Sequence, residues 1–403
     1  MDTRFQKTTK ILKKKNKVVL INQNTGQWIR ISDEVFDIIN RMIERKYNLM
    51  DLEKYFYNCE DCDYIKNVMR SMFLSGILIN ERYNNSDRNK IAMIEITSKC
   101  NLNCIHCGWK LSKKYGDLNT TDMISVIDKV VKWNPMEIVL SGGEPLLRED
   151  IDILLKRIKE RYSGCITLSS NGTLISETNI DLLSKYVNKF EISLDGFSEE
   201  TCSIIRGNGV YKKVIENINL LQKYCCKNIY LSMVVGTGNN AMNIKKFNNL
   251  CKLINVKPLL REYMKINNKE IDGLFEHTDD NINKEYKIVM NKKEITACSC
   301  TAGKKDILIR SNGDVFPCQR FTTENYCMGN LTIDNNIDEI IANHKNIIKE
   351  QFKERLKKMG CEYCGVIDFC WTCPAEVIYY DSNINTVDVC NYMKKELNEG
   401  VWG

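Results

Sequence analysis

The chain has 403 residues, of which 43% are hydrophobic and 27% are charged, values close to those of ordinary globular proteins. This length exceeds what a single hydrophobic core usually holds, so we expect two or three domains. The composition excludes a disordered or fibrous chain. The basic N-terminus lacks an apolar signal segment, and no run of about eighteen apolar residues occurs, which predicts a cytoplasmic protein without a membrane span.

Cysteine is the outlying residue type, with 19 copies against only 3 histidines. A disulfide framework is an alternative, but the odd count and the expected reducing compartment argue against it. The scarcity of histidine argues against zinc sites of the mixed His/Cys kind. The cysteines therefore indicate metal centres made of thiolates alone, either zinc sites or iron-sulfur clusters.

The net charge is +6, and seven basic but no acidic residues lie between Arg4 and Lys17. This run is either a solvated basic edge or an attraction for an acidic partner such as an acidic peptide. No aromatic motif of an RNA-binding module accompanies it, so nucleic acid is the weaker alternative.

Residues 1–85 read as a separate, winged-helix-like module. The apolar run Val18–Ile21, a turn at Gly26 and the apolar residues from Trp28 predict a hairpin, and Ser32 is a candidate helix N-cap. Three helices and a final strand are expected at 35–43, 49–56, 64–72 and 77–79. The polar stretch that follows is the expected linker.

Residues 86–290 alternate apolar strands with amphipathic helices. Six βα repeats of this kind predict an α/β domain whose parallel sheet is closed or partly closed into a barrel, with active-site residues at the carboxyl ends of the strands. The strands are expected at Met93–Ile96, Glu137–Leu140, Cys165–Leu168, Phe190–Leu194, Ile229–Val235 and Leu259–Tyr263.

Residues 291–403 are rich in cysteine and poorly periodic, with a short strand at Ile307–Ile309 and one long basic helix at 337–358. This region has too little apolar material for a good core. Metal clusters are therefore expected to hold it together.

Three cysteines, Cys100, Cys104 and Cys107, lie in the pattern CxxxCxxC directly beyond the first barrel strand. Three thiolates on one tight loop can hold three irons of a cubane cluster and leave the fourth iron open. An open iron binds and activates a ligand rather than merely carrying electrons.

This loop resembles that of the radical S-adenosylmethionine (SAM) superfamily, with His106 in the place usually taken by an aromatic residue. The resemblance implies a partial six-repeat barrel and an oxygen-sensitive 4Fe-4S cluster whose open iron chelates SAM. One electron then splits SAM into methionine and a 5′-deoxyadenosyl radical, which takes a hydrogen atom from the substrate.

Further polar positions follow the next strands in the order that the superfamily's SAM site would need. The resemblance implies contacts to the amino group, ribose and carboxylate of SAM, including a forked contact from the arginine. These positions are Gly142, Gly143, Glu144, Ser170, Asn171, Ser193, Asp195 and Arg206.

The C-terminal cysteines resemble those of the SPASM domain, an extension of radical SAM enzymes that holds two auxiliary 4Fe-4S clusters. The resemblance gives the first cluster Cys300, Cys318 and Cys373, and the second Cys361, Cys364, Cys370 and Cys390. The fourth ligand of the first cluster stays open between Cys298, Cys327, the substrate and none. Two zinc sites of four thiolates each are the alternative.

The front module resembles the RiPP recognition element, a winged-helix domain that binds the leader of a ribosomally made precursor peptide, here at an exposed sheet edge beside the basic run. The full set of resemblances implies a peptide maturase with three 4Fe-4S clusters, SAM and a low-potential flavodoxin- or ferredoxin-type electron donor. The expected reaction joins a peptide cysteine sulfur to a carbon radical in a thioether.

Several alternatives stay open. A carbon–carbon crosslink would use the same radical chemistry, and a maturase acting on a folded protein, as sulfatase-activating enzymes do, would need no leader clamp. A redox-sensing DNA-binding protein would cleave no SAM and would bind duplexes in a salt-dependent way. No general acid or base is assigned, although Glu262 and Tyr263 end the sixth strand.

Overall fold

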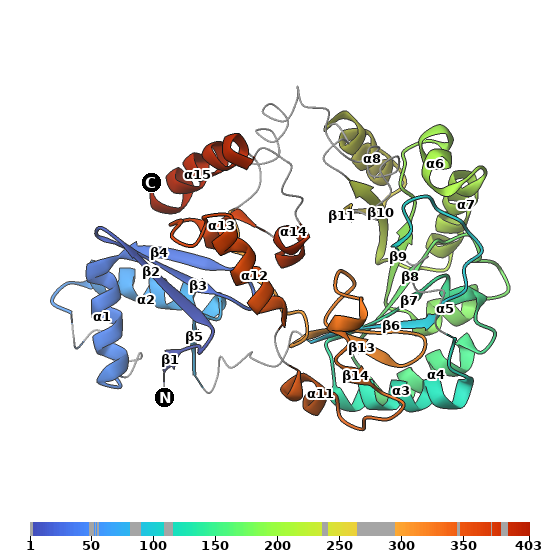
Figure 1. Ribbon diagram of the computed structural model, residues 1–403, viewed down its shortest axis with the longest axis horizontal. Coiled ribbons are helices and arrows are strands. Elements are labelled where there is room, and N and C mark those ends of the chain that lie inside the picture. Colours follow the sequence, from blue (N-terminus) through green and yellow to red (C-terminus); the bar gives the residue numbers. More distant parts are fainter. Residues whose placement is uncertain are drawn as a thin grey trace. The chain divides into compact units, whose positions relative to one another are not determined.

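The computed structural model describes residues 3–47, 52, 54, 56–80, 90–108, 116–235, 241–263, 295–344, 347–371, 373–379 and 386–403. The chain divides into two compact units, which Figure 1 colours along the sequence. The first unit joins the front of the chain to its C-terminal part, and the second contains the barrel strands. Their ranges are Met1–Arg88, Lys293–Thr301 and Lys345–Gly403 for the first, and Asn89–Lys292 and Ala302–His344 for the second.

The second unit is built on one sheet in the order β11-β10-β9-β8-β7-β6-β12-β13-β14. All neighbours from β11 to β12 are parallel, and the last three strands pair antiparallel. The six expected barrel strands and the partial α/β barrel are therefore confirmed. They are β6 (Ile91–Thr97), β7 (Glu137–Gly142), β8 (Cys165–Ser170), β9 (Lys189–Ser193), β10 (Ile229–Val235) and β11 (Lys257–Glu262), extended by β12 (Asp306–Ile309), β13 (Asp314–Phe316) and β14 (Gly329–Asn330).

Alternate residues of the barrel strands β6 to β10 pack against helices that cover one face of the sheet (Figure 1). In β6 these residues are Ala92, Ile94 and Ile96, all fully buried. The period of two leaves the residues between them for the opposite, inner face. The helices are α3 (Thr120–Trp133), α4 (Ile151–Arg161), α5 (Ile180–Tyr186), α6 (Glu199–Arg206), α7 (Val210–Lys223) and α8 (Ala241–Leu253). No helix in the described part of the chain is long and apolar enough to cross a bilayer.

The inner face carries a ladder of paired charges. Lys189 Nζ lies 3.2 Å from a carboxylate oxygen of Glu137 and 2.8 Å from one of Glu191. Arg261 pairs with Glu191 from the other side, and Thr167 donates to Glu137 at 2.5 Å. Because each buried charge has a partner, the ladder crosses from β7 to β11 without an unpaired ion.

The expected single helix at 337–358 is wrong. The chain instead forms α11 (Ile337–Asn343) and α12 (Ile347–Lys358), and His344 between them has an extended backbone. Asparagine at 343 and 346 favours helix ends over helix interiors, which explains the break. It is also a boundary, because α11 belongs to the second unit and α12 to the first.

The front module contains the expected hairpin, formed by β3 (Lys17–Asn22) and β4 (Trp28–Ser32), and Ser32 caps α1 (Asp33–Glu44) by accepting a hydrogen bond from Val35 N. The basic run forms a further strand, β2 (Thr9–Lys14), which pairs with β3. The third expected helix is α2 (Cys59–Leu74), and β5 (Leu78–Ile79) pairs with β1 (Arg4–Phe5). The helix expected at 49–56 lies largely outside the described residues.

The C-terminal part of the first unit contacts the front module directly. The Trp28 ring meets Phe369 edge-on, with 5.2 Å between centroids, and Trp28 Nε1 donates to the Ile295 carbonyl at 2.6 Å. Lys10 Nζ lies 2.6 Å from the Asp368 carboxylate. The front module is therefore attached to a segment that immediately precedes Cys370.

Trp28→Ala removes both the ring contact with Phe369 and the hydrogen bond to Ile295. We expect the free energy of unfolding of this unit to fall by about 3 kcal/mol, and the amides of residues 366–371 to exchange faster by hydrogen-exchange mass spectrometry. Trp28→Phe, which keeps a ring but loses the indole N–H, should show the smaller loss of about 1 kcal/mol. Equal exchange in wild type and Trp28→Ala would contradict the attachment.

Candidate active site

The cysteine loop leaves the carboxyl end of β6. Cys100, Cys104 and Cys107 are free thiols, of which Cys104 is buried, Cys107 is half-buried and Cys100 is exposed. The Cys107 amide donates to the Cys104 carbonyl at 3.3 Å, so the last two cysteines share one tight turn. The loop thus presents three thiols at the end of the barrel where the strand order places active sites.

Gly142 and Gly143 have no side chain, which allows the end of β7 to lie directly against the start of this loop. A Cβ at Gly142 would lie 2.1 Å from the Thr97 carbonyl oxygen, and one at Gly143 would lie 2.1 Å from that of Lys99. Gly143 N donates to Thr97 O, and Glu144 N donates to Lys99 O, both at 2.8 Å. The resemblance implied contacts from Gly142 and Gly143 to SAM; the structure shows a close approach of both residues to the cysteine loop itself.

Glu144 lies completely buried behind the glycine pair and joins β7 to the end of β8. Its carboxylate accepts hydrogen bonds from Ser170 Oγ at 2.8 Å, from Asn171 N at 2.7 Å and from Leu146 N at 3.1 Å. Burial raises the pKa of Glu144, against the opposing effect of these donors. The carboxylate therefore holds Ser170 and Asn171 in place, beside the cysteine loop.

Asn171 reaches the loop with its side chain. Its Nδ2 donates to Asn101 Oδ1 at 2.8 Å and lies 4.0 Å from Cys100 Sγ. Ser193, at the end of β9, accepts from Ser232 Oγ at 3.4 Å. The structure thus places Asn171 against the cysteine loop and Ser193 at the end of the next strand.

Asp195 lies at the centre of a group of buried polar residues under the loop. Its carboxylate accepts hydrogen bonds from Arg206, His106 and the Val234 amide. Complete burial acts to raise the pKa of Asp195, but the charge of Arg206, with the help of His106, holds it well below its usual range. The role of His106 could not be expected from the sequence, because the CxxxCxxC spacing gives no signal for it.

The thiols are suited to a positively charged centre. Burial raises the pKa of Cys100 and of Cys104, and Arg206 acts in the opposite direction at Cys104. Buried thiols of this kind ionise when a metal centre binds them, because the metal charge replaces the lost hydration. The donor set at the end of β6 therefore fits a thiolate-bound cluster.

The other cysteines of the predicted cluster sets are divided between the two units. Cys361 is close enough to Cys390 and Cys364 for their charges to raise its pKa, although burial has the larger effect. The Cys364 amide donates to the Cys361 carbonyl at 3.0 Å. Cys370 ends α13 (Ile367–Cys370).

In the first unit, Cys373 precedes α14 (Pro374–Ile378), and the Cys298 amide donates to the Asp368 carbonyl at 2.5 Å. Cys300 also belongs to this unit, whereas Cys318 and Cys327 belong to the second. In the described ranges, no three His, Cys, Asp or Glu side chains form a site for a single metal ion.

Glu262 and Tyr263 lie at the carboxyl end of β11, where the Tyr263 amide donates to the Val235 carbonyl at 2.8 Å.

Glu95 is a buried acid on the inner face of β6 that sequence analysis did not single out. Only 1% of its surface is exposed, and its Oε1 has no hydrogen-bond partner in the part of the chain that the structure describes. Burial raises its pKa to about 8, although Arg310, which follows β12 beside it, acts to lower it. The sequence of β6 gives no signal for this position. Glu95 is buried because β6 lies between β7 and β12 in the sheet, and that neighbourhood is known only from the structure.

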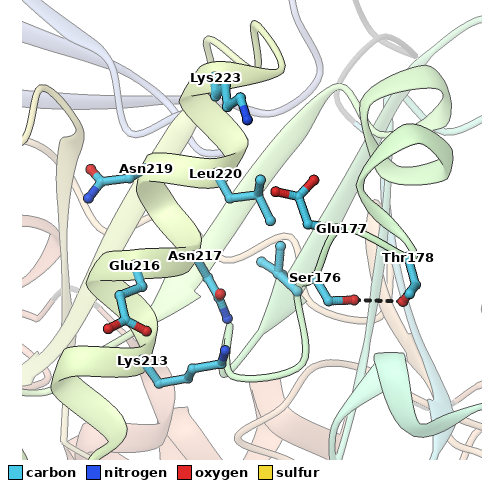
Figure 2. Close-up of a pocket in the computed structure, with 10 residues that line it drawn as sticks. Ser176, Glu177, Thr178, Lys213, Glu216, Asn217, Asn219, Leu220 and Lys223 are labelled. Atoms are coloured by element: carbon cyan, nitrogen blue, oxygen red, sulfur yellow. Dashed lines mark hydrogen bonds between the residues drawn. The ribbon is translucent and has the colours of Figure 1, made fainter.

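A groove of about 600 Å³ lies on the outside of this unit, between α7 and the segment Ile175–Thr178 (Figure 2). None of the predicted site residues lines it. Asn217 of α7 connects it to the candidate site, because its Nδ2 donates to the Gly172 carbonyl at 2.7 Å, directly after Asn171. Asn217, which lines the groove, therefore holds the Ser170–Gly172 turn through this hydrogen bond.

Comparison with known proteins agrees with this geometry. Residues 94–251 match the Radical SAM superfamily, and residues 298–374 match SPASM, an iron-sulfur cluster-binding domain. A GTP 3′,8-cyclase of Limosilactobacillus fermentum is 28% identical over 43% of this chain and 54% of its own length. Mycofactocin maturase MftC of Mycobacterium tuberculosis is 24% identical over 68% of this chain and 75% of its own length. The chain thus spans about half the length of the cyclases it matches.

Solved structures share the fold. Streptococcus suis SuiB bound to S-adenosylmethionine aligns with a TM-score of 0.57 and 17% identity, over 94% of this chain and 97% of SuiB. The protein anSMEcpe with bound AdoMet aligns with a TM-score of 0.54 and 20% identity, over 77% of this chain and 96% of its own.

The three-thiol loop at the mouth of the partial α/β barrel lies within the match over residues 94–251, so this part of the chain is a radical SAM domain. With the domain match that follows the barrel, the chain is a radical SAM/SPASM enzyme. Its radical SAM domain uses a 4Fe-4S cluster and SAM, and its SPASM domain binds auxiliary iron-sulfur clusters. The interpretation as a DNA-binding redox sensor is thereby set aside.

Gly143→Ala places a methyl group against the Lys99 backbone, which cannot yield as a side chain would. We expect a loss of about 1–3 kcal/mol of unfolding free energy and a lower iron content after anaerobic reconstitution, measured by colorimetric iron assay. Gly108→Ala is the matched control in the same loop, because a Cβ there meets nothing within 4 Å among the described residues. Equal iron content in the two variants would contradict the role of Gly143.

Glu95→Gln tests the buried acid. Its pKa rises from 4.5 to about 8 on folding, so the folded state holds the extra proton and the free energy of unfolding of the wild type falls as pH rises through that window. The glutamine variant lacks this loss and should gain about 3–5 kcal/mol relative to wild type by about pH 9. Urea unfolding of anaerobic apoprotein measures it, with exposed Glu149→Gln as control. A pH-independent difference would refute the raised pKa.

Proposed function

We propose that this enzyme matures a ribosomally made precursor peptide by installing a thioether crosslink. The single observation that carries the proposal is the attachment of the front module to the cysteine-bearing segment at Phe369, within a chain that also has a radical SAM barrel. Two similar proteins support a peptide substrate: MftC is a maturase by name, and a SuiB structure contains its precursor peptide SuiA.

The cluster at Cys100, Cys104 and Cys107 would bind SAM over the strand ends that carry Gly142, Gly143, Glu144, Ser170, Asn171 and Ser193. The auxiliary clusters would use Cys300, Cys318 and Cys373, and Cys361, Cys364, Cys370 and Cys390. The domain division that accompanies this proposal is 1–85 for leader binding, 86–290 for the barrel and 291–403 for the auxiliary clusters.

The proposed reaction balances as follows. The 5′-deoxyadenosyl radical takes a hydrogen atom from a peptide carbon and becomes 5′-deoxyadenosine. The carbon radical joins the sulfur of a peptide cysteine, whose thiol proton is released. The auxiliary clusters would accept the surplus electron, and a low-potential flavodoxin- or ferredoxin-type donor in the cytoplasm would supply the electron that cleaves the next SAM.

The leader would bind along β2. This strand lies at one edge of the three-stranded sheet, and no other strand in the described residues pairs with its outer side. The strand carries Lys14 and is followed by Lys15, which favour an acidic segment, whereas Lys10 and Lys13 are already paired with Asp368 and Asp33. An extended leader could add as a fourth strand there.

The experiment incubates anaerobically reconstituted enzyme with SAM, dithionite and candidate short cysteine-bearing peptides, taken from the open reading frames next to its own. We expect 5′-deoxyadenosine and a peptide that has lost two hydrogen atoms and can no longer be alkylated at one cysteine. Cys104→Ala should abolish both products. A peptide that loses two hydrogens but keeps every alkylatable cysteine would indicate a carbon–carbon crosslink, and oxidation of a folded protein instead would favour the sulfatase-maturase type. No deoxyadenosine from wild type would refute the radical SAM function.

A further inference from the structure

Asp195, directly after β9, has both carboxylate oxygens engaged within the protein. Its Oδ2 lies 2.7 Å from Arg206 Nε, 2.6 Å from Arg206 Nη2 and 3.0 Å from His106 Nε2. The Val234 amide donates to Oδ1 at 2.6 Å. The side chain of Asp195 is 3% exposed, and those of Arg206 and His106 are each 9% exposed. The acid that was expected to face SAM is thus enclosed by protein donors.

Arg206 connects this acid to a cluster cysteine. Its Nη1 donates to Cys104 Sγ at 3.8 Å, on the side of the guanidinium away from the bonds of Nε and Nη2. The neighbouring backbone makes a second contact, because the Ile105 amide donates to the Ile205 carbonyl at 3.0 Å. The last turn of α6 therefore contacts the cysteine loop through one backbone hydrogen bond and one side-chain hydrogen bond.

The backbone at Asp195 has an unusual conformation that directs its side chain toward Arg206 and His106. Its φ is +56°, in the left-handed region, which is unfavourable for a residue other than glycine. The next residue must be glycine, because a Cβ at Gly196 would lie 2.5 Å from Cys202 N. Backbone strain of this kind is found mostly at functional sites, where the surrounding structure fixes the conformation and thereby the direction of the side chain.

We propose that Asp195, Arg206 and His106 are positioning residues that lock the cysteine loop for its cluster, rather than contacts to SAM. A guanidinium forked onto a buried carboxylate is already neutralised, so it has little charge left for the SAM carboxylate. Removing one member of such a buried pair leaves the other charge buried without compensation and is strongly destabilising. The inference rests on the proposed function, because it assumes a cluster on Cys100, Cys104 and Cys107.

The lock also acts on the electronics of the cluster. An N–H that donates to a ligating sulfur stabilises the more negative, reduced state, and residues that support metal ligands in this way commonly matter 10–100-fold for metal retention. Arg206 supplies such a donor at Cys104. It would therefore both hold the loop and make the cluster easier to reduce.

The test compares Arg206→Gln and Asp195→Asn with Arg148→Gln in the full chain after anaerobic reconstitution. Arg148 is a matched control, because it is 8% exposed and paired with Asp150 at 2.6 Å, but it touches no cysteine of the loop in the described residues. Three quantities are measured: iron retention against a chelator, the EPR spectrum of the reduced cluster without SAM, and the Kd for SAM. Subtracting the spectrum of C100A/C104A/C107A removes the auxiliary clusters.

We expect both test variants to lose iron to the chelator about 10–100-fold faster and to show an altered EPR spectrum without SAM, whereas Arg148→Gln keeps both. The Kd for SAM of the loaded fraction should stay that of wild type. A wild-type SAM-free spectrum and retention combined with a raised Kd would overturn the lock and make the residues SAM contacts. Absence of the difference spectrum in wild type itself would refute the proposed function and, with it, the lock.

Should Arg206→Gln fail to fold by circular dichroism, Arg206→Lys carries the same test. Lysine keeps the charge but not the fork, so retention should recover partly while the SAM-free spectrum stays altered. A lysine variant with the wild-type spectrum would overturn the lock.

Discussion

The chemistry of this enzyme depends on the close contact between the ends of neighbouring strands and the loop that follows β6. Gly142 and Gly143 allow the backbone of β7 to lie against residues 97–99, at distances that leave no room for a Cβ. Glu144 then joins β7 to the turn after β8. Because these contacts are between backbones and buried polar groups, the loop has few alternatives once the sheet has formed, and its thiols are presented together.

The inner face of the barrel uses charge in two ways. In the ladder of Glu137, Lys189 and Glu191 every charge has a partner of opposite sign, and these pairs join the inner faces of β7 and β9. Glu95 is instead buried with an oxygen unpaired among the described residues, and its pKa is about 8. Burying this carboxyl group five residues before Cys100 lowers the stability of the fold at neutral and higher pH, and an apolar residue would fill the same space without that cost.

The two units divide the chain differently from its order in sequence. The front module forms a unit with residues 345–403, through contacts such as Trp28 with Phe369 and Lys10 with Asp368. A peptide bound along β2 would therefore touch a module that directly contacts the segment of Cys298 and Cys370. This connection gives the front module a physical reason to be part of the same chain.

The sequence by itself determined the order and period of the barrel strands, the cap at Ser32 and the three-cysteine loop, because each follows from local spacing and local backbone preference. It also placed the polar residues at the strand ends in the right order. Only the tertiary structure decided what those residues touch. Asp195 and Arg206 are eleven residues apart, and Glu144 and Asn171 lie on different strands, so their pairing depends on sheet order and burial. The attachment of Trp28 to Phe369 likewise arises from a contact between distant segments, which no local pattern records.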